Sequence, residues 1–147
     1  MFAGFDHVDC RVKSLAAVEA FYDALMPELG LPNKRYSYVD DAGEWHHASA
    51  DHRYNTIEFF EEAQPDRATF FVGFIESRNH VPSATRIAFR VDRSRLLEIE
   101  GLLAQVGAQN VERSEDFEQY PAVFFEDPAG TKLEIVARAA RTLELAG

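Results

Sequence analysis

The segments HVDCRV, residues 7–12, and RIAFRV, residues 86–91, decide the fold of this chain. In both segments apolar side chains alternate with polar or small ones, which predicts a strand with one apolar and one polar face. Both end in Arg-Val, and both are followed at the same distance by apolar residues at helical spacing. The repeat predicts that one structural unit occurs twice in the chain.

Working outward from residues 7–12, the first half is predicted to contain one helix and several strands. The helix begins after Ser14, a typical N-cap residue, and closes at Gly30. Residues 40–55 are polar and predict a loop with a short strand at residues 45–48. The longer predicted strands of this half cover residues 5–12, 35–39, 56–61 and 69–75.

The second half repeats this order around residues 86–91. A helix is predicted over residues 94–106, and Gly107 ends it. Asp-Pro-Ala-Gly at residues 127–130 predicts a tight turn between the last two strands. The predicted strands of this half cover residues 85–91, 110–113, 122–126 and 131–137.

The sequence therefore predicts an α+β fold of two βαβββ modules in a single domain. Module 1 covers about residues 1–80, module 2 about residues 81–138, and residues 139–147 form a tail that is a frayed helix or a disordered end. Each module is expected to form a four-stranded mixed sheet with a helix on one face, and the other faces are expected to meet around a cleft. The residues predicted to be buried are Val8, Cys10, Val12, Leu15, Phe21, Leu25, Ile87, Phe89, Leu103, Leu133 and Ile135.

Composition excludes several classes of function. The 147 residues carry a formal net charge of −10, which argues against binding nucleic acid or an anionic membrane. Cys10 is the only cysteine, so neither a disulfide framework nor a cysteine-based zinc site is expected. No apolar run is long enough for a membrane helix, and the first residues lack the pattern of a signal peptide. A cytoplasmic protein is the expectation.

Two motifs carry a resemblance to a known superfamily. The first is FDHVDCRV at residues 5–12, ahead of AFYD at residues 20–23, and the second is FEDPAGTKLEIV at residues 125–136. Together they resemble the vicinal oxygen chelate superfamily of glyoxalase I, bleomycin-resistance proteins and extradiol dioxygenases. The resemblance implies two βαβββ modules, frequent dimerisation, and one divalent metal (Zn, Ni, Fe or Mn). It also implies that the first and last strands of each module each supply one metal ligand.

Carried over to this sequence, the four ligand positions are His7, Val72, Arg86 and Glu134. His7 and Glu134 are suitable metal ligands, and the resemblance gives Glu134 a catalytic role as well. Arg86 and Val72 have no lone pair to donate. Glu58 is the nearest carboxylate to the third position, but it belongs to the preceding strand.

Several other side chains are candidates for binding a ligand. Arg86 is predicted to lie within hydrogen-bonding reach of Glu134, or to bind a carboxylate or phosphate of a ligand. Tyr54 and Tyr120 occupy corresponding places in the two halves, and their hydroxyls are candidates for contacts in the cleft. The histidines of the first loop have an open role, as replacement metal ligands or as solvated side chains; they are His46, His47 and His52.

Two functions remain open at this point. One is a metal-dependent lyase or dioxygenase that acts on a small oxygen-bearing substrate, with the metal at His7 and Glu134. The other is a metal-free protein that binds or sequesters a small molecule, as drug-resistance proteins of the superfamily do. Whether the chain is an enzyme is therefore undecided, and a homodimer with a small-molecule ligand is expected in either case.

Overall fold

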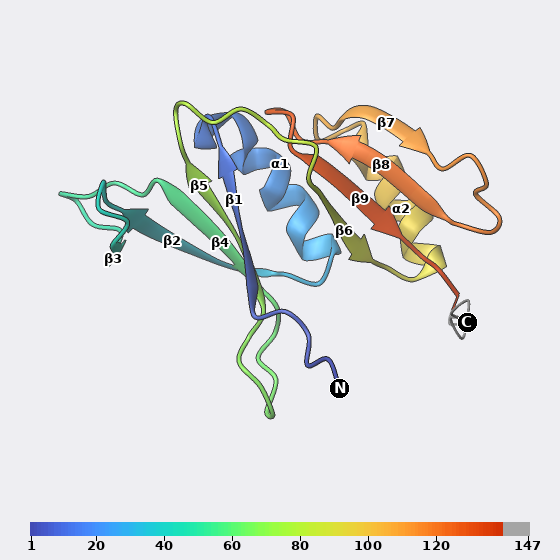
Figure 1. Cartoon of the computed structure of the whole chain (residues 1–147), viewed down its shortest axis with the longest axis horizontal. Helices are drawn as coiled ribbons and strands as arrows, with labels where there is room; N and C mark the ends of the chain where they lie inside the picture. Colours follow the sequence, from blue (N-terminus) through green and yellow to red (C-terminus); the bar gives the residue numbers. More distant parts are fainter. Residues whose placement is uncertain (140–147) are drawn as a thin grey trace, which may run out of the picture.

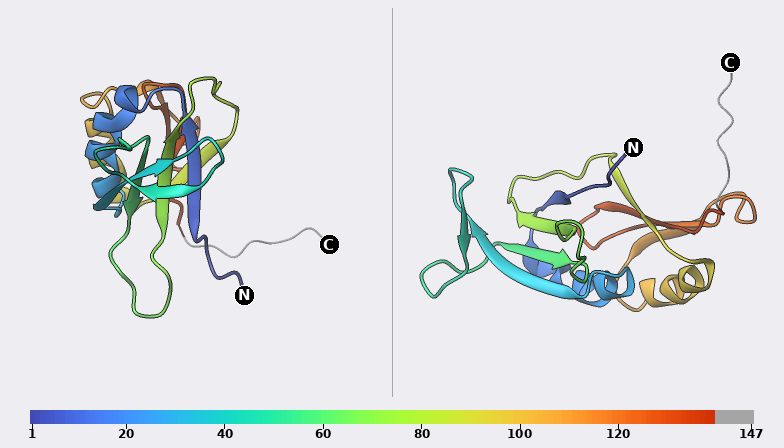
Figure 2. Two further views of the ribbon diagram at one scale, coloured as in Figure 1. Left: turned by 90° about the vertical axis from the view of Figure 1, so that its left-hand side faces the viewer. Right: turned by 90° about the horizontal axis from the view of Figure 1, so that it is seen from below.

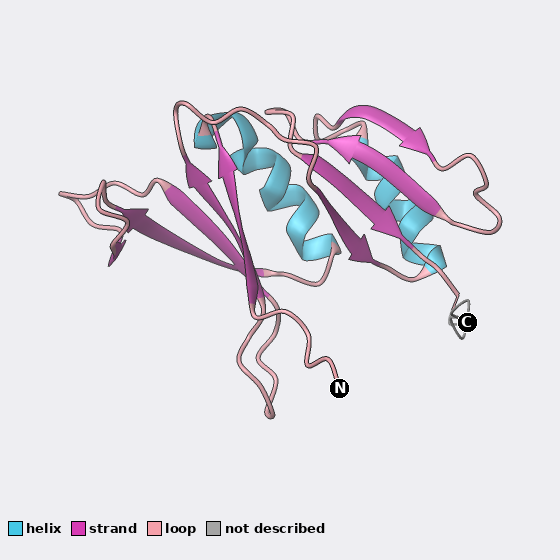
Figure 3. Cartoon of the chain, in the orientation of Figure 1, coloured by secondary structure: helices cyan, strands magenta, loops and turns pink. Residues whose placement is uncertain are grey.

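Two mixed sheets and two helices form the computed structural model, which describes residues 1–139 (Figures 1 and 3). The predicted α+β fold with two βαβββ modules is confirmed. The predicted tail lies almost entirely outside the described residues. Within residues 1–139 no helix is long and apolar enough to cross a membrane.

Module 1 is a five-stranded sheet with one helix, α1 (Leu15–Glu28). The strand order is β1-β5-β4-β2-β3, in which β1 and β5 are parallel and the other neighbours are antiparallel. The prediction of four strands was wrong for this module, because the short strand β3 joins the edge of the sheet. The strands are β1 (His7–Val12), β2 (Asn33–Val39), β3 (Trp45–His47), β4 (Thr56–Phe60) and β5 (Phe71–Glu76).

Module 2 is a four-stranded sheet with helix α2 (Arg93–Leu103). Its order, β6-β9-β8-β7, matches the first four strands of module 1, again with a parallel first pair. The strands are β6 (Arg86–Arg90), β7 (Gln109–Arg113), β8 (Ala122–Glu126) and β9 (Lys132–Val136).

The registers of the two parallel pairs show which positions correspond. His7 lies opposite Phe71 and Asp9 opposite Gly73 in module 1, whereas Arg86 lies opposite Lys132 and Ala88 opposite Glu134 in module 2. The position equivalent to Glu134 is therefore Gly73, and not Val72 as the sequence alone suggested. The prediction slipped by one residue because loop 61–70 of module 1 is longer than turn 127–131 of module 2.

Helix α1 depends on a distant residue for its N-terminal cap. Ser14 occupies the predicted N-cap position, but its side chain makes no capping hydrogen bond. Instead the backbone N–H of Leu15 donates to Oε2 of Glu76 on β5, at 2.8 Å. A carboxylate is favourable there because the helix N-terminus carries a partial positive charge. This contact ties the start of α1 to the sheet that it covers.

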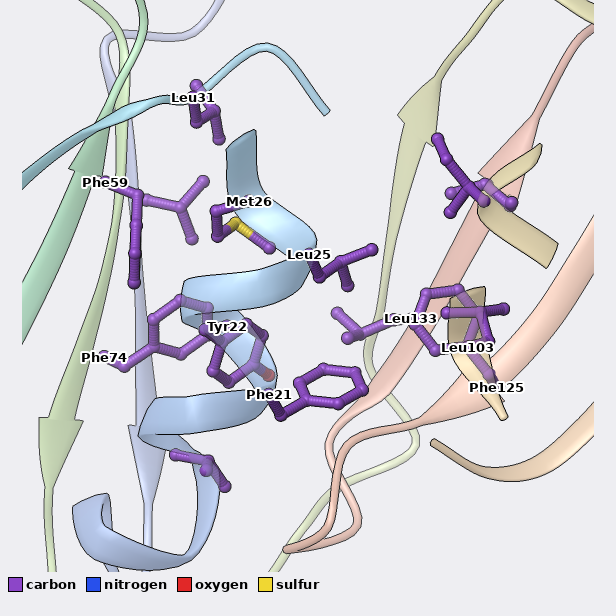
Figure 4. Packing of buried hydrophobic residues seen from close by; sticks show 14 of the residues in the cluster. Phe21, Tyr22, Leu25, Met26, Leu31, Phe59, Phe74, Leu103, Phe125 and Leu133 are labelled. Carbon is purple, nitrogen blue, oxygen red and sulfur yellow. The ribbon is translucent and has the colours of Figure 1, made fainter. Parts of the chain in front are cut away.

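A single hydrophobic core runs through both modules (Figure 4). Most of the side chains predicted to be buried are buried. Val8, Cys10, Ile87 and Phe89 are only partly buried, because β1 and β6 are edge strands. Partial burial raises the pKa of the Cys10 thiol to about 11, so this cysteine has little thiolate character.

Helix α1 lies between the two sheets and joins the modules (Figure 4). Phe21 packs against Phe125 of β8 at 6.4 Å between ring centroids, and the Tyr22 hydroxyl donates to Oδ2 of Asp127 at 2.5 Å. Both helices lie along the same side of the molecule (right view of Figure 2). We call the face of each sheet that its own helix does not cover the outer face.

The position of α1 decides where the outer faces point. Because α1 covers one face of sheet 1 and also packs on module 2, the outer face of module 1 points away from module 2. The two outer faces therefore do not enclose a common cleft within one chain; the sequence had left open whether the modules pair within one chain or across a dimer. Between the modules, a pocket of about 300 Å³ lies instead at the edges of β1 and β6.

Candidate functional site

A row of stacked rings crosses the outer face of module 1. The His7 ring on β1 stacks on Phe71 of β5 at 4.7 Å and 4° between the ring planes. Phe71 in turn stacks on Phe60 of β4 at 4.7 Å, and the Arg35 guanidinium of β2 lies 5.0 Å from the centre of the Phe60 ring. The row fixes the plane of the His7 ring across four strands.

The next row on this face contains a buried ion pair. Glu58 is fully buried, and its carboxylate accepts hydrogen bonds from Nε and Nη2 of Arg35 at 3.0 and 2.9 Å and from the Ser37 hydroxyl at 2.6 Å. The position beside Glu58 on β5 is Gly73, where a larger residue would be crowded. A Cβ there would lie 2.9 Å from Oδ1 of Asp9 and 3.7 Å from Cγ of Glu58. Asp9 and Glu58 thus flank the place where a side chain equivalent to Glu134 would stand.

His7 itself lies among carboxylates. Its Nδ1 is 2.7 Å from Oδ2 of Asp6, and its Nε2 is 3.6 Å from Oδ2 of Asp9. The hydrogen bond to Asp6 raises the pKa of His7 above its ordinary value. The His7 side chain is 43% exposed. It is accessible to a ligand on the outer face.

The outer face of module 2 centres on Glu134. This carboxylate is 6% exposed, and its Oε1 accepts a hydrogen bond from the Tyr120 hydroxyl at 2.6 Å. The same hydrogen bond raises the pKa of Tyr120 above its ordinary value. The structure thus brings together two of the predicted site residues, Tyr120 and Glu134.

Arg86 does not pair with Glu134. Its guanidinium lies over the Phe124 ring, 4.6 Å from the ring centre, and no hydrogen bond or ion pair within residues 1–139 joins it to Glu134. The predicted contact was wrong because Arg86 lies opposite Lys132, two residues away from Glu134 along β9. Tyr120 meets the carboxylate instead, and Arg86 keeps its N–H donors on an exposed face.

The other candidates lie elsewhere. Tyr54 donates its hydroxyl to Oε2 of Glu19 on α1 at 2.9 Å, so it belongs to the helix side of module 1 and is far in the fold from the Glu134 face. His46 contacts Oδ2 of Asp40 at 2.8 Å, and His52 stacks on Tyr38. His47 lies opposite Ser37 and thus on the outer face of module 1.

The donor set does not fit the four-ligand metal site that the resemblance implies. His7 and Glu134 carry lone pairs, but the guanidinium of Arg86 has none and Gly73 has no side chain. Within residues 1–139 no group of three or more His, Cys, Asp or Glu side chains is arranged to hold a metal ion. Sequence reasoning missed Arg35, which is recognisable only from its contact with the buried Glu58.

Comparisons with solved structures agree with this fold. A glyoxalase/bleomycin resistance protein from Albidiferax ferrireducens is 19% identical, with a TM-score of 0.58, over 92% of this chain and 98% of its own. The fosfomycin resistance protein FosX from Listeria monocytogenes, in complex with Mn(II) and sulfate ion, is 15% identical with a TM-score of 0.60, over 95% and 93%. FosX from Mesorhizobium loti is 17% identical with a TM-score of 0.51, over 95% and 94%.

These similarities confirm that the chain has the fold of the glyoxalase/bleomycin resistance and FosX proteins. No family model matches the sequence, and no curated protein matches it either. Fold alone does not fix chemistry, so the function depends on the side chains of the two outer faces.

Proposed function

Starting from a chain with the fold of the glyoxalase/bleomycin-resistance and FosX proteins, we propose that it binds a small oxygen-bearing molecule without a divalent metal. The site would form where the outer face of module 1 of one copy meets the outer face of module 2 of a second copy. The protein would then be a homodimer that binds or sequesters its ligand in the manner of a drug-resistance protein. A cytoplasmic location stays a prediction from the sequence.

Arg86 is the observation that carries this proposal. It occupies the first-strand position where the superfamily places a metal ligand, and it presents a permanent cation there. The Phe124 ring beneath it holds the guanidinium by a cation–π contact without using its N–H donors. Planar N–H donors of this kind match carboxylate, phosphate or sulfate oxygens. A cation at this position also opposes the binding of a second cation.

The homodimer is supported by the separation of the two outer faces. His7 lies on one and Glu134 and Arg86 on the other, with α1 between the modules. One chain therefore does not bring these candidates together, whereas a second copy with the opposite pairing of faces would. The charges of the two faces are complementary. On module 1, Asp6 and Asp9 lie beside His7. Module 2 carries the cations Arg86, Arg90 and Lys132.

The second candidate is the metal-dependent lyase or dioxygenase. It is favoured by His7 and Glu134, which remain sound ligands, and by the Mn(II) bound to FosX of Listeria monocytogenes. In that case the metal would act as a Lewis acid on a substrate oxygen, and Tyr120 would orient Glu134. The metal would need ligands or waters in place of Arg86 and Gly73.

Binding of oxyanions in the presence of EDTA distinguishes the two candidates. We expect sulfate or phosphate to raise the thermal unfolding midpoint of metal-free protein, because ligand binding stabilises the native state. Arg86→Gln should abolish this rise, whereas Arg90→Gln, four residues further along the same face of β6, should keep most of it. Stabilisation that requires added Mn(II), Zn(II) or Ni(II) would favour the enzyme instead.

The dimer is tested by mass and by mixing of variants. Light scattering at micromolar concentration should give twice the mass of one chain. If each site joins two copies, His7→Ala and Arg86→Gln proteins should each lose anion binding as homodimers. After they are unfolded and refolded together, about a quarter of the sites should recover, since only mixed dimers contain an intact pair of faces. A monomeric mass, or no recovery on mixing, would count against the shared site.

A further inference from the structure

A second pocket lies on the outer face of module 1, at the strands β2 and β3. Its volume is about 320 Å³. It shares the outer face of module 1 with His7, but it is a separate pocket, since none of the residues His7, Arg86 and Glu134 lines it. Its lining residues are Arg35, Ser37, Trp45, His46 and His47.

Arg35 is a fixed cation at one end of this pocket. The fully buried Glu58 grips its Nε and Nη2 in a two-point contact, and Phe60 lies under its guanidinium. Hydrogen bonding to Glu58 also raises the pKa of Arg35. Within residues 1–139 Glu58 is its only hydrogen-bond partner, and half of the side chain is exposed. The remaining N–H donors are therefore held in one orientation and available to a ligand.

Trp45 provides an apolar wall of the same pocket. Its side chain is 45% exposed, which leaves a large aromatic surface in contact with water. By register Trp45 lies opposite Val39, and His47 lies opposite Ser37, so both belong to the outer face of module 1. A flat ring that covers Trp45 would remove apolar surface from water and gain stacking. The Ser37 hydroxyl donates its hydrogen bond to Glu58, so it helps to position the Glu58 carboxylate that holds Arg35.

We propose that this pocket binds a small aromatic carboxylate, with its oxygens on Arg35 and its ring against Trp45. Glu58 neutralises the charge of Arg35, so the ligand is recognised by directional N–H donors more than by net charge. Binding is therefore expected to depend only weakly on salt. A carboxylate is preferred to a neutral amide because a charge-assisted two-point hydrogen bond is stronger than a neutral one.

Trp45 also makes the pocket observable, because it is the only tryptophan in the chain. Titration of the purified full-length protein with benzoate should change the Trp45 fluorescence in a saturable way. Benzamide, which has the same shape without the charge, should bind about tenfold more weakly. Calorimetry of the same two titrations gives affinities that do not depend on the fluorophore. The absence of a saturable benzoate signal, or equal affinity for the two compounds, would overturn the proposal.

A double variant separates loss of binding from loss of stability. Arg35→Gln alone would leave the buried Glu58 carboxylate without a cation and is expected to destabilise the fold. The double variant Arg35→Gln with Glu58→Gln removes both charges, and it should remain folded while losing the preference for benzoate over benzamide. Arg67→Gln is the matched control, because Arg67 also pairs with a glutamate, Glu61, but lies on loop 61–70 away from the pocket. It should keep the preference.

Arg86→Gln separates this pocket from the site proposed above. It should leave benzoate binding unchanged even if it abolishes binding of sulfate, because Arg86 lies in module 2 and does not line the pocket. If Arg86→Gln removes the benzoate response, or if the double variant of Arg35 and Glu58 keeps the preference, the aromatic carboxylate does not bind here.

Discussion

Replacement of Asp127 by alanine is expected to lower the free energy of unfolding by about 3 kcal/mol, because it leaves several donors without partners. Asp127 is fully buried in the turn between β8 and β9. Its Oδ1 accepts the backbone N–H groups of Ala129 and Thr131 at 2.8 and 2.9 Å, and its Oδ2 accepts the Tyr22 hydroxyl at 2.5 Å. One side chain thus holds the last turn of module 2 and anchors helix α1 of module 1.

The loss is measured by urea unfolding of the wild type and the variant. Asp116→Ala is the matched control, because Asp116 also accepts a backbone N–H, that of Gln119, but does so in an exposed loop. Its replacement should cost less than about 1 kcal/mol. Tyr22→Phe removes only the hydroxyl and should have an effect between the two. Equal losses for Asp127→Ala and Asp116→Ala would show that the buried contact between the modules adds nothing.

The Tyr22 hydroxyl is kept protonated by its surroundings. Burial, together with the nearby Asp127 carboxylate, holds the pKa of Tyr22 well above its usual range. The phenol therefore stays protonated, and remains a hydrogen-bond donor, at neutral pH.

Replacement of Arg86 by histidine is expected to raise the affinity for Zn(II) or Ni(II) by about tenfold or more, since it adds a ligand. The change exchanges a permanent cation for a neutral imidazole at the first strand of module 2. Glu134 lies on the adjacent strand of the same outer face, where Tyr120 orients it. Together with His7 of a second copy, the new histidine would complete three protein ligands of types that these metals accept.

Isothermal titration with each metal compares the wild type with Arg86→His. The control is Arg90→His, which places a histidine four residues further along the same face of β6, opposite Val136, where the superfamily places no metal ligand. That variant should gain little. Tight stoichiometric metal binding by the wild type, with no further gain from Arg86→His, would favour the metal-dependent enzyme over the metal-free binding protein.

Local patterns were sufficient to predict the elements and their order. Alternation in residues 7–12 and 86–91 and the apolar spacing after Ser14 depend only on neighbours in sequence, and the predicted strands and helices agree with the observed ones to within a few residues. The superfamily resemblance likewise came from contiguous motifs, and the structural comparisons confirm its fold. The sequence by itself therefore determined the two βαβββ modules, the outer-face positions of His7 and Glu134, and the misfit of Arg86 as a metal ligand.

The tertiary structure alone decided which residues meet. Gly73 replaced Val72 as the equivalent of Glu134, because register across a parallel pair depends on the length of the preceding loop and not on the strand itself. The contacts of Arg86 with Phe124 and of Tyr120 with Glu134 likewise join different segments of module 2. The Arg35–Glu58 pair joins residues 23 positions apart, and Tyr22 and Asp127 are 105 apart. Contacts over such separations are set by sheet order and by the packing of α1 between the modules, neither of which leaves a periodic signal in the chain.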